Sequence, residues 1–202
     1  MAIGIVGTMA VMKKRNSLYA YLLCALFAAI TAICSQIMIP LPFTPVPINL
    51  ALLAVWVCGG VLGARRGAIS VLVYILLGAI GVPVFHGLQS GIGVLAGPTG
   101  GYIAGFLPAV IIYGLLHRRF VSNQKKEKGK PAKTIGRFAL AAITGLPALA
   151  ACYALGTLWF AFITKTGLLP ALLMCVVPFI PGDIMKLIAA AAICKALPST
   201  WY

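Results

Sequence analysis

Acidic side chains are nearly absent from this chain. Its 202 residues include only two, Glu127 and Asp183, against 16 lysines and arginines, and charged residues make up 9% of the total. A soluble domain carries about a quarter charged residues, so the composition argues against one. The net charge of +14 does not indicate nucleic-acid binding either. The basic residues stand at the ends of apolar runs, which is how membrane topology is encoded.

Catalytic and metal-binding patterns are also missing. The six cysteines are scattered without a C-x-x-C pair, and we interpret them as small buried hydrophobic side chains. Neither histidine belongs to an H-E-x-x-H helix, and no serine has a histidine and a third group nearby. Gly129-Lys130 is followed by Pro131, so the G-x-x-x-x-G-K-[ST] phosphate loop is absent. We therefore expect no enzyme, no cofactor and no ATP hydrolysis by such a loop.

The chain is instead rich in hydrocarbon. Hydrophobic residues make up 62% of it, and several apolar runs approach the roughly 20 residues that span a bilayer. Lipid-facing strands would alternate apolar and polar residues, and no such alternation occurs. We predict an all-α polytopic membrane protein with one domain over residues 17–198, after an N-terminal cytoplasmic segment 1–16.

The first eleven residues are apolar but too short to span. The charges Lys13-Lys-Arg15 follow this run instead of preceding it, which is unlike a signal peptide. We expect natural translation to begin at Met9 or Met12, with a weak interfacial anchor as the alternative.

Six transmembrane helices are expected, at about 18–38, 46–63, 67–84, 102–116, 138–163 and 183–197. Four prolines between 40 and 47 prevent the first helix from continuing, and a glycine-rich loop at 86–101 precedes the fourth helix. The short apolar stretch 168–180 is interrupted by proline, so we interpret it as a re-entrant or interfacial piece. Counted as a span, it would give seven helices.

The distribution of charge favours six. With the N-terminus in the cytoplasm, 14 of the 16 basic residues fall inside, including those of the loop 117–137, as the positive-inside rule requires. Seven spans would move Lys195 to the outer side. We therefore expect both termini in the cytoplasm.

Asp183 is the strongest functional candidate. It lies in an otherwise apolar region with Lys186 three residues later, on the same helix face. One group accepts hydrogen bonds and the other donates them, which suits a ligand that offers N–H and C=O together, such as a urea, amide or lactam. The alternative is a helix N-terminal cap tied to Lys186, because Asp183 follows Pro181-Gly182.

Other polar or aromatic residues are weaker candidates for the lining of an outward-facing cavity. The irregular segments 40–47, 86–101 and 181–186 fall on the outer side, and irregular backbone at membrane depth is tolerated where it lines a cavity or is buried in protein. The candidates near this cavity are Gln89, Asn49, Tyr74, Tyr102 and Trp159. For each of them, core packing or interfacial placement is the alternative.

The first helix carries small residues at a spacing of four, which allows close helix approach within a membrane. The two registers are Ala25 with Ala29 and Ala28 with Ala32. Either register could dock another membrane subunit, and ordinary packing within the chain is the alternative.

Several motifs after Ser17 resemble the BioY family, the biotin-specific substrate-binding (S) components of energy-coupling-factor (ECF) transporters. The most specific are Gly97-Pro-Thr-Gly-Gly-Tyr102 and Phe179-Ile-Pro-Gly-Asp183 with Lys186. Shorter matches are Pro45-Val-Pro47, Leu62-Gly63, Tyr74-Ile-Leu-Leu-Gly78, Gly81-Val-Pro-Val-Phe85 and Gly156-Thr-Leu-Trp159.

The resemblance implies a six-helix S-component fold in a prokaryotic cytoplasmic membrane and capture of biotin from outside. It implies that Asp183 and Lys186 contact the fused rings of biotin. One of the two alanine registers would contact a transmembrane coupling subunit, which two separate ATPases drive. Some relatives carry an arginine for the valerate carboxylate in the loop after the third helix. Here Leu88–Gly93 has none, so Gln89, Ser90, Lys165 or backbone N–H groups would have to serve.

A rival hypothesis is a secondary transporter of a small amphipathic solute. It would work alone and use Asp183 as a proton-coupled carboxyl group.

Overall fold

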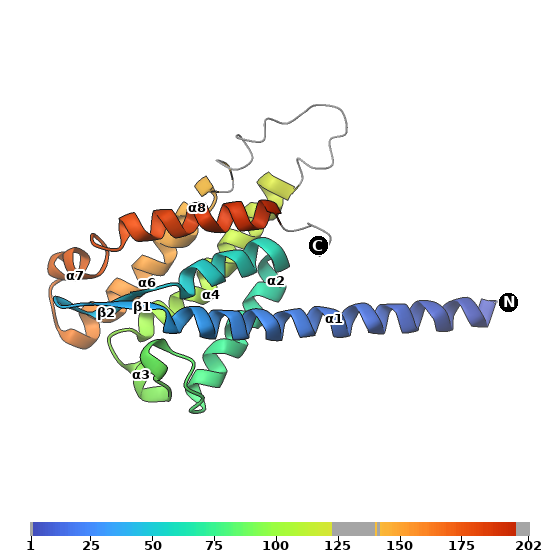
Figure 1. Ribbon diagram of the computed structural model, residues 1–202, viewed down its shortest axis with the longest axis horizontal. Helices are drawn as coiled ribbons and strands as arrows, with labels where there is room; N and C mark the ends of the chain where they lie inside the picture. The colour runs from blue at the N-terminus through green and yellow to red at the C-terminus, as the bar shows by residue number, and fades with distance from the viewer. Residues whose placement is uncertain (1, 123–139, 141, 197–202) are drawn as a thin grey trace.

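The computed structural model describes residues 2–122, 140 and 142–196, and these residues form a bundle of helices (Figure 1). Its main helices are α1 (Ala2–Gln36), α2 (Ala51–Ala79), α4 (Gly100–Leu116), α6 (Leu146–Thr164) and α8 (Ile180–Ala196). Its shorter elements are β1 (Met38–Leu41), β2 (Thr44–Asn49), η1 (His86–Leu88), α3 (Ile92–Ala96), the π-helical η2 (His117–Ser122) and α7 (Leu168–Cys175).

Four helical segments are long and apolar enough to cross a membrane. They are residues 18–36 of α1, the whole of α2, residues 100–120 and α6. The helices α7 and α8 meet at a bend of 52° and make a fifth candidate if they are counted as one span. The prediction of a helical, multi-pass membrane protein is therefore confirmed for the described part of the chain.

The helix α2 is broken in its middle. Gly63 has φ 77° and ψ 176°, a conformation that side-chain-bearing residues avoid, and the chain changes direction there (Figure 1). The end of α4 packs against this break, because a Cβ atom on Gly114 would lie 2.5 Å from the backbone nitrogen of Ala64. The boundary expected between the helices 46–63 and 67–84 thus lies at Gly63.

The proline-rich segment differs from the expected irregular loop, and it forms the one two-stranded sheet among the described residues. It forms an antiparallel hairpin, β1–β2, that pairs Met38 with Asn49 and Ile39 with Ile48. The register shifts between Ile39 and Leu41, where Pro40 lies. A two-stranded hairpin tolerates proline because each strand has an unpaired edge.

Several expected helix boundaries are corrected by these elements. The second helix starts at Ala51 instead of Val46, and the third ends at Ala79 instead of Val84. The last begins at Ile180 instead of Asp183, because Phe179 and Ile180 already form the turn that leads into it. The start of the expected helix 138–163 and most of the loop 117–137 lie outside the described residues. Segment 1–16 is helical from Ala2 and continuous with the first span.

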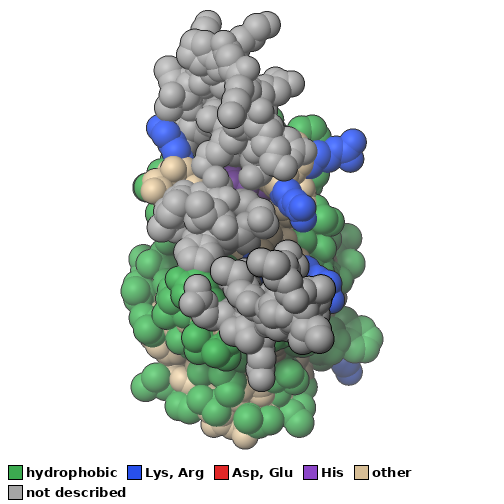
Figure 2. All heavy atoms as spheres, turned by 90° about the vertical axis from the view of Figure 1, so that its right-hand side faces the viewer, with side chains coloured by type: hydrophobic (Ala, Val, Ile, Leu, Met, Phe, Trp, Pro, Cys, Tyr) green, Lys and Arg blue, Asp and Glu red, His purple; other side chains and the backbone are tan. Residues whose placement is uncertain are grey.

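The two ends of the bundle differ in character. The hairpin, α3 and α7 gather at one end, while α1 begins and α8 ends toward the other (Figure 1). Figure 2 faces this second end and shows Lys and Arg side chains around it. Arg65, Arg118, Arg119 and Lys195 are exposed. The irregular segments therefore lie opposite the basic end.

Candidate functional site

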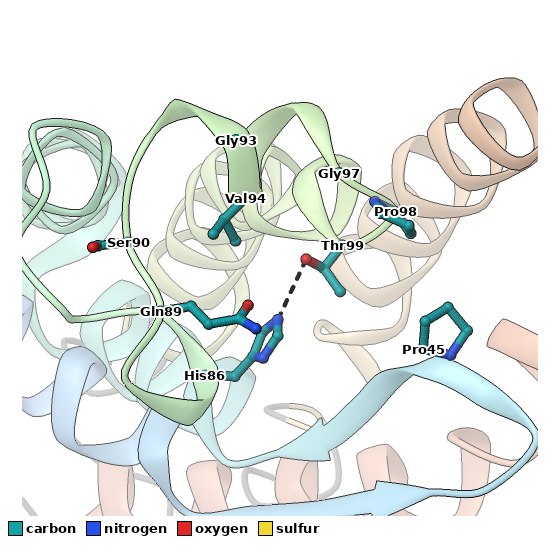
Figure 3. Close-up of a pocket in the computed structure, with 9 residues that line it drawn as sticks. All are labelled: Pro45, His86, Gln89, Ser90, Gly93, Val94, Gly97, Pro98 and Thr99. Carbon is teal, nitrogen blue, oxygen red and sulfur yellow. Dashed lines mark hydrogen bonds between the residues drawn. The ribbon is translucent and has the colours of Figure 1, made fainter.

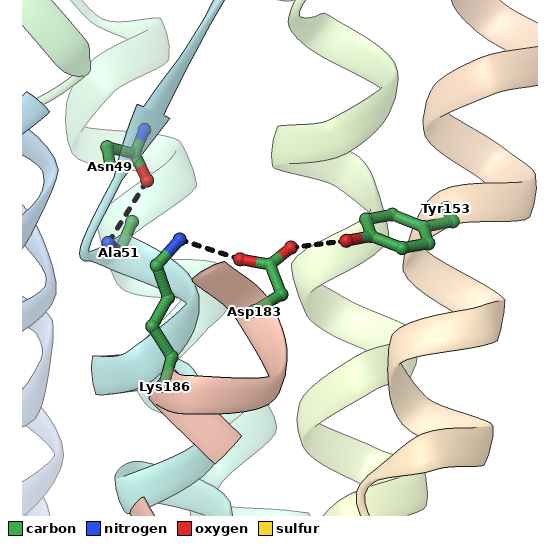
Figure 4. Close-up of polar contacts among 5 residues, drawn as sticks. All are labelled: Asn49, Ala51, Tyr153, Asp183 and Lys186. Atoms are coloured by element: carbon green, nitrogen blue, oxygen red, sulfur yellow. Dashed lines mark hydrogen bonds and ion pairs between the residues drawn. The ribbon is translucent and has the colours of Figure 1, made fainter. Parts of the chain in front are cut away.

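The two predicted charges form a buried ion pair near the start of α8. The side chains of Asp183 and Lys186 lie one turn apart, and the Lys186 Nζ–Asp183 Oδ1 distance is 2.6 Å. Asp183 is 3% exposed and Lys186 8%. The second carboxylate oxygen, Oδ2, accepts a hydrogen bond of 2.6 Å from the hydroxyl of Tyr153 on α6 (Figure 4). Side chains therefore satisfy both oxygens of Asp183, and this arrangement differs from a simple helix cap.

A narrow cavity of about 60 Å³ lies beside this pair. The hairpin, the start of α2 and helices α4, α6 and α8 each contribute to its wall. The lining residues are Val46, Pro47, Asn49, Leu52, Tyr102, Phe106, Cys152, Tyr153, Phe179, Asp183 and Lys186. The charged pair thus ends a pocket whose remaining walls are mostly apolar or aromatic, as is usual for small-molecule sites.

Tyr102 and Asn49, two predicted site residues, line this cavity. The Tyr102 hydroxyl lies 3.1 Å from Thr157 Oγ1 and donates to the carbonyl of Cys175 at 3.3 Å. Its ring packs against Gly156, where a Cβ atom would lie 2.2 Å from the ring. Asn49 Oδ1 accepts from the Ala51 N–H at the start of α2, near Lys186 (Figure 4). Both side chains are therefore held in fixed positions.

The inner cavity continues toward the hairpin end of the molecule. A second small cavity shares Val46, Pro47, Asn49, Tyr102 and Phe106 with the first and adds Tyr74, His86, Thr99 and Ile103. Tyr74, a further predicted site residue, is 2% exposed and packs its ring edge-on against Phe85. It thus contributes to the wall above the ion pair and not to the ion pair itself.

An open cavity of about 550 Å³ adjoins the second one and shares His86 and Thr99 with it. Gln89, also predicted, lies beside the His86 ring at its edge, and His86 Nε2 is 3.3 Å from Thr99 Oγ1 (Figure 3). Burial lowers the pKa of His86 below its usual 6.5 and so favours the neutral imidazole. The three cavities adjoin in series from the hairpin end to Asp183, and this series is here called the ligand path.

Trp159 lies apart from this path. It is 37% exposed, and its indole N–H donates to the carbonyl of Gly97 at 2.9 Å. Gly101 packs directly against its side chain. Among the described residues, Trp159 therefore braces the glycine-rich segment from outside and lines none of the three cavities.

Sequence reasoning did not single out Tyr153, Thr99, Cys152 or His86 as site residues. Tyr153 is 30 residues from Asp183 and meets it only because α6 packs near α8. No local spacing signals this contact. The sequence indicated the open cavity only through Thr99, which lies directly before α4 within a glycine-rich motif.

The alanines of α1 divide into two environments. Ala25 and Ala29 are exposed, in line with exposed Leu22 and Ile33. Ala28 is 2% exposed and belongs to the core, and Ala32 is partly buried against it. The register that is accessible to another helix is therefore Ala25 with Ala29.

Sequence comparisons identify relatives over nearly the whole chain. The model of the BioY family matches residues 9–201. "Biotin transporter BioY" of Rhizobium etli is 38% identical over 87% of this chain and 90% of its own length. "Biotin transporter BioY2" of Lactococcus lactis is 37% identical over 93% of this chain and 96% of its own.

A solved structure is similar over nearly the whole chain. It is described as the crystal structure at 2.1 Å of the S-component for biotin from an ECF-type ABC transporter. The TM-score is 0.75 at 28% identity, with 90% of this chain and 92% of that one covered. The sequence match, the solved structure and the motifs that end in Asp183 and Tyr102 agree, and the chain belongs to the BioY family.

Proposed function

We propose that this chain is the biotin-binding S component of an ECF transporter, which captures biotin outside the cell and delivers it inward. The observation that carries the proposal is the buried pair of Asp183 and Lys186 at the inner end of the ligand path, with the Tyr153 hydroxyl bonded to Asp183. The family and the named relatives support the same ligand.

The pair retains hydrogen-bonding capacity for a cyclic urea. A carboxylate has about four lone-pair sites, and two of those on Asp183 are used by Lys186 and Tyr153. An ammonium group has three donors, and one of those on Lys186 is used. A ureido ring can therefore donate an N–H to Asp183 and accept at its C=O from Lys186 without breaking the pair. Tyr102, Asn49 and Phe106 would flank the fused rings.

The open cavity would receive the acidic end of the ligand. His86, Gln89 and Thr99 offer an imidazole, an amide and a hydroxyl there, and no acidic residue lines it. Its volume of about 550 Å³ lies in the range of small-molecule sites. The inner cavity of about 60 Å³ has to widen for a bicyclic ring system. The hairpin, which forms part of its wall, and the glycine-rich segment, which lines the two adjoining cavities, would move to admit the ligand.

Six crossings are proposed for the membrane domain. The break at Gly63 divides α2 into two crossings, which join those of α1, α4, α6 and α8. The chain then begins and ends at the basic end, and the positive-inside rule places that end in the cytoplasm. Biotin would enter from the opposite, outer side of a prokaryotic cytoplasmic membrane.

Ala25 and Ala29 are proposed to dock a transmembrane coupling subunit, because they are exposed small residues of α1 within the span 18–36. Since the sequence has no phosphate loop, two partner ATPases would supply the energy.

Titration calorimetry of the purified chain with biotin tests the proposal. We expect saturable binding at micromolar concentration or below, and its absence would overturn the assignment. In membrane vesicles, uptake should require the ATPase partners and ATP. Uptake by the chain alone that collapses with the proton gradient would favour the secondary transporter.

A further inference from the structure

Gln36, the last residue of α1, binds the backbone of a distant segment. Its Nε2 lies 2.9 Å from the carbonyl oxygen of Phe85 and 3.2 Å from that of Val84, and its Oε1 accepts from the Leu88 N–H at 2.9 Å. The neighbouring Ser35 hydroxyl also donates to the Val84 carbonyl. One side chain thus bridges both ends of a short loop that lies about 50 residues further along the chain.

This loop, residues 84–89, is here called the entrance loop because two of its members line the open cavity. They are His86 and Gln89. The loop closes on itself, since the Phe85 N–H donates to the Gln89 carbonyl at 3.0 Å. Within it Leu88 has φ 59°, in the left-handed region that a leucine avoids. The accepting oxygen of Gln36 bonds to the N–H of this same leucine, so it helps to hold the unfavourable conformation.

The two halves of the entrance loop are anchored differently. Val84 is 8% and Phe85 0% exposed, and the Phe85 ring packs on Gly78 and Tyr74. Leu88 is 68% exposed, and Gln89 is also exposed. The core therefore holds the first half, while the second half has little apolar burial to fix it. The contact from Gln36 to Leu88 acts on the half that forms the cavity wall.

We propose that Gln36 is a positioning residue that latches the entrance loop over the ligand path and thereby sets how long biotin stays bound. The inference rests on the function proposed above. The latch stands on the helix that carries Ala25 and Ala29, which precede it by 11 and 7 residues, or about 16 and 10 Å of helical rise. A coupling subunit that shifts α1 through these alanines would act directly on the latch and so on ligand release.

The matched variants are Gln36→Leu and Thr31→Val. The first keeps a similar size but loses all three contacts with the loop. The second removes a buried hydroxyl of the same helix, whose hydrogen bond goes to the Phe27 carbonyl within α1 at 2.8 Å. Gln36→Glu is a third variant, which keeps an acceptor for Leu88 but loses the donors to Val84 and Phe85.

The measurement is the release of radiolabelled biotin from the purified full chain after addition of excess unlabelled biotin, with the melting temperature recorded for each variant. We expect the release rate of Gln36→Leu to rise about tenfold, with Gln36→Glu between it and the wild type. Thr31→Val should release at the wild-type rate. The melting temperature is the control, because a purely structural role of Gln36 would lower it without changing the release rate. We expect it to fall by similar amounts in the Gln36 and Thr31 variants.

The latch would be overturned if Gln36→Leu released biotin at the wild-type rate, or if the release rate of Thr31→Val rose as much as that of Gln36→Leu. Either result would leave the proposed function standing. Should Gln36→Leu fail to fold, a wild-type release rate in Gln36→Glu would overturn the latch in the same way. A wild-type chain without saturable biotin binding would overturn the function and the latch together.

Discussion

Asp183→Asn is the substitution that most directly perturbs the ion pair. The asparagine has the same shape but no charge, and it keeps one acceptor oxygen. That oxygen can still accept from Lys186, while the new NH₂ group can donate to the Tyr153 hydroxyl, which is able to accept. The local hydrogen bonds can therefore be remade, and the principal loss is the negative charge beside a lysine that is 8% exposed.

The magnitude of the effect depends on this change of charge. Hydrogen bonds to charged groups contribute about 1.5–3 kcal/mol and neutral ones about 0.5–1.5 kcal/mol. The ureido N–H bond to position 183 should therefore weaken by about 1–2 kcal/mol, or roughly 5–30-fold in Kd. Stability should fall more, by about 3–5 kcal/mol, because the Lys186 ammonium remains buried without its partner. Asp183→Asn combined with Lys186→Met removes that orphaned charge, so it should recover stability but not affinity.

Calorimetric titration with biotin gives the change in Kd, and thermal unfolding in the same detergent gives the change in stability. Tyr153→Phe is the matched control, because it removes one hydrogen bond to Asp183 and leaves both charges. A folded Asp183→Asn protein with the wild-type Kd would refute the reasoning, since Asp183 would then serve only the start of α8.

Three further substitutions probe the wall, the mouth and the partner face. Gly156→Ala should weaken biotin binding about tenfold or more in a filter-binding assay. The added Cβ atom would lie 2.2 Å from the Tyr102 ring and push that ring into the cavity. Unchanged binding would show that the ring can move elsewhere. His86→Leu should narrow the difference in Kd between biotin and its uncharged amide, measured by competition, and an unchanged difference would remove His86 from the carboxylate site. Ala29→Leu should reduce co-purification with the coupling subunit, while biotin binding by the isolated chain persists. The control is Ala154→Leu, at an exposed position of α6. Equal complex recovery for both leucine variants would contradict the assignment of the docking face.

The ion pair was predictable from sequence because its geometry is local. Asp183 and Lys186 are three residues apart, and a single helical turn brings them to one face. Their isolation in an apolar chain marked them as functional candidates. The third member, Tyr153, was not predictable. It reaches the carboxylate because α6 lies near α8, and no spacing in the sequence indicates this contact.

The hairpin escaped prediction for a different reason. Prolines at 40, 42, 45 and 47 were interpreted as helix breakers, which is correct, but the structure that the chain adopts beyond a broken helix depends on pairing between strands. The contact of Trp159 with Gly97 likewise could not be predicted from the sequence. A periodic helix pattern identifies the faces of α6, but it does not show which face meets the cavity and which meets the glycine-rich segment.

Recognition of a cyclic urea by the buried pair is the central claim. Its direct test is calorimetric titration of the purified chain with biotin and with the diamine that remains when the ureido carbonyl is removed. We predict saturable binding of biotin and binding of the diamine weaker by at least about 100-fold, because the Lys186 donor would lose its acceptor in a buried site. Equal affinity for the two compounds would contradict the claim.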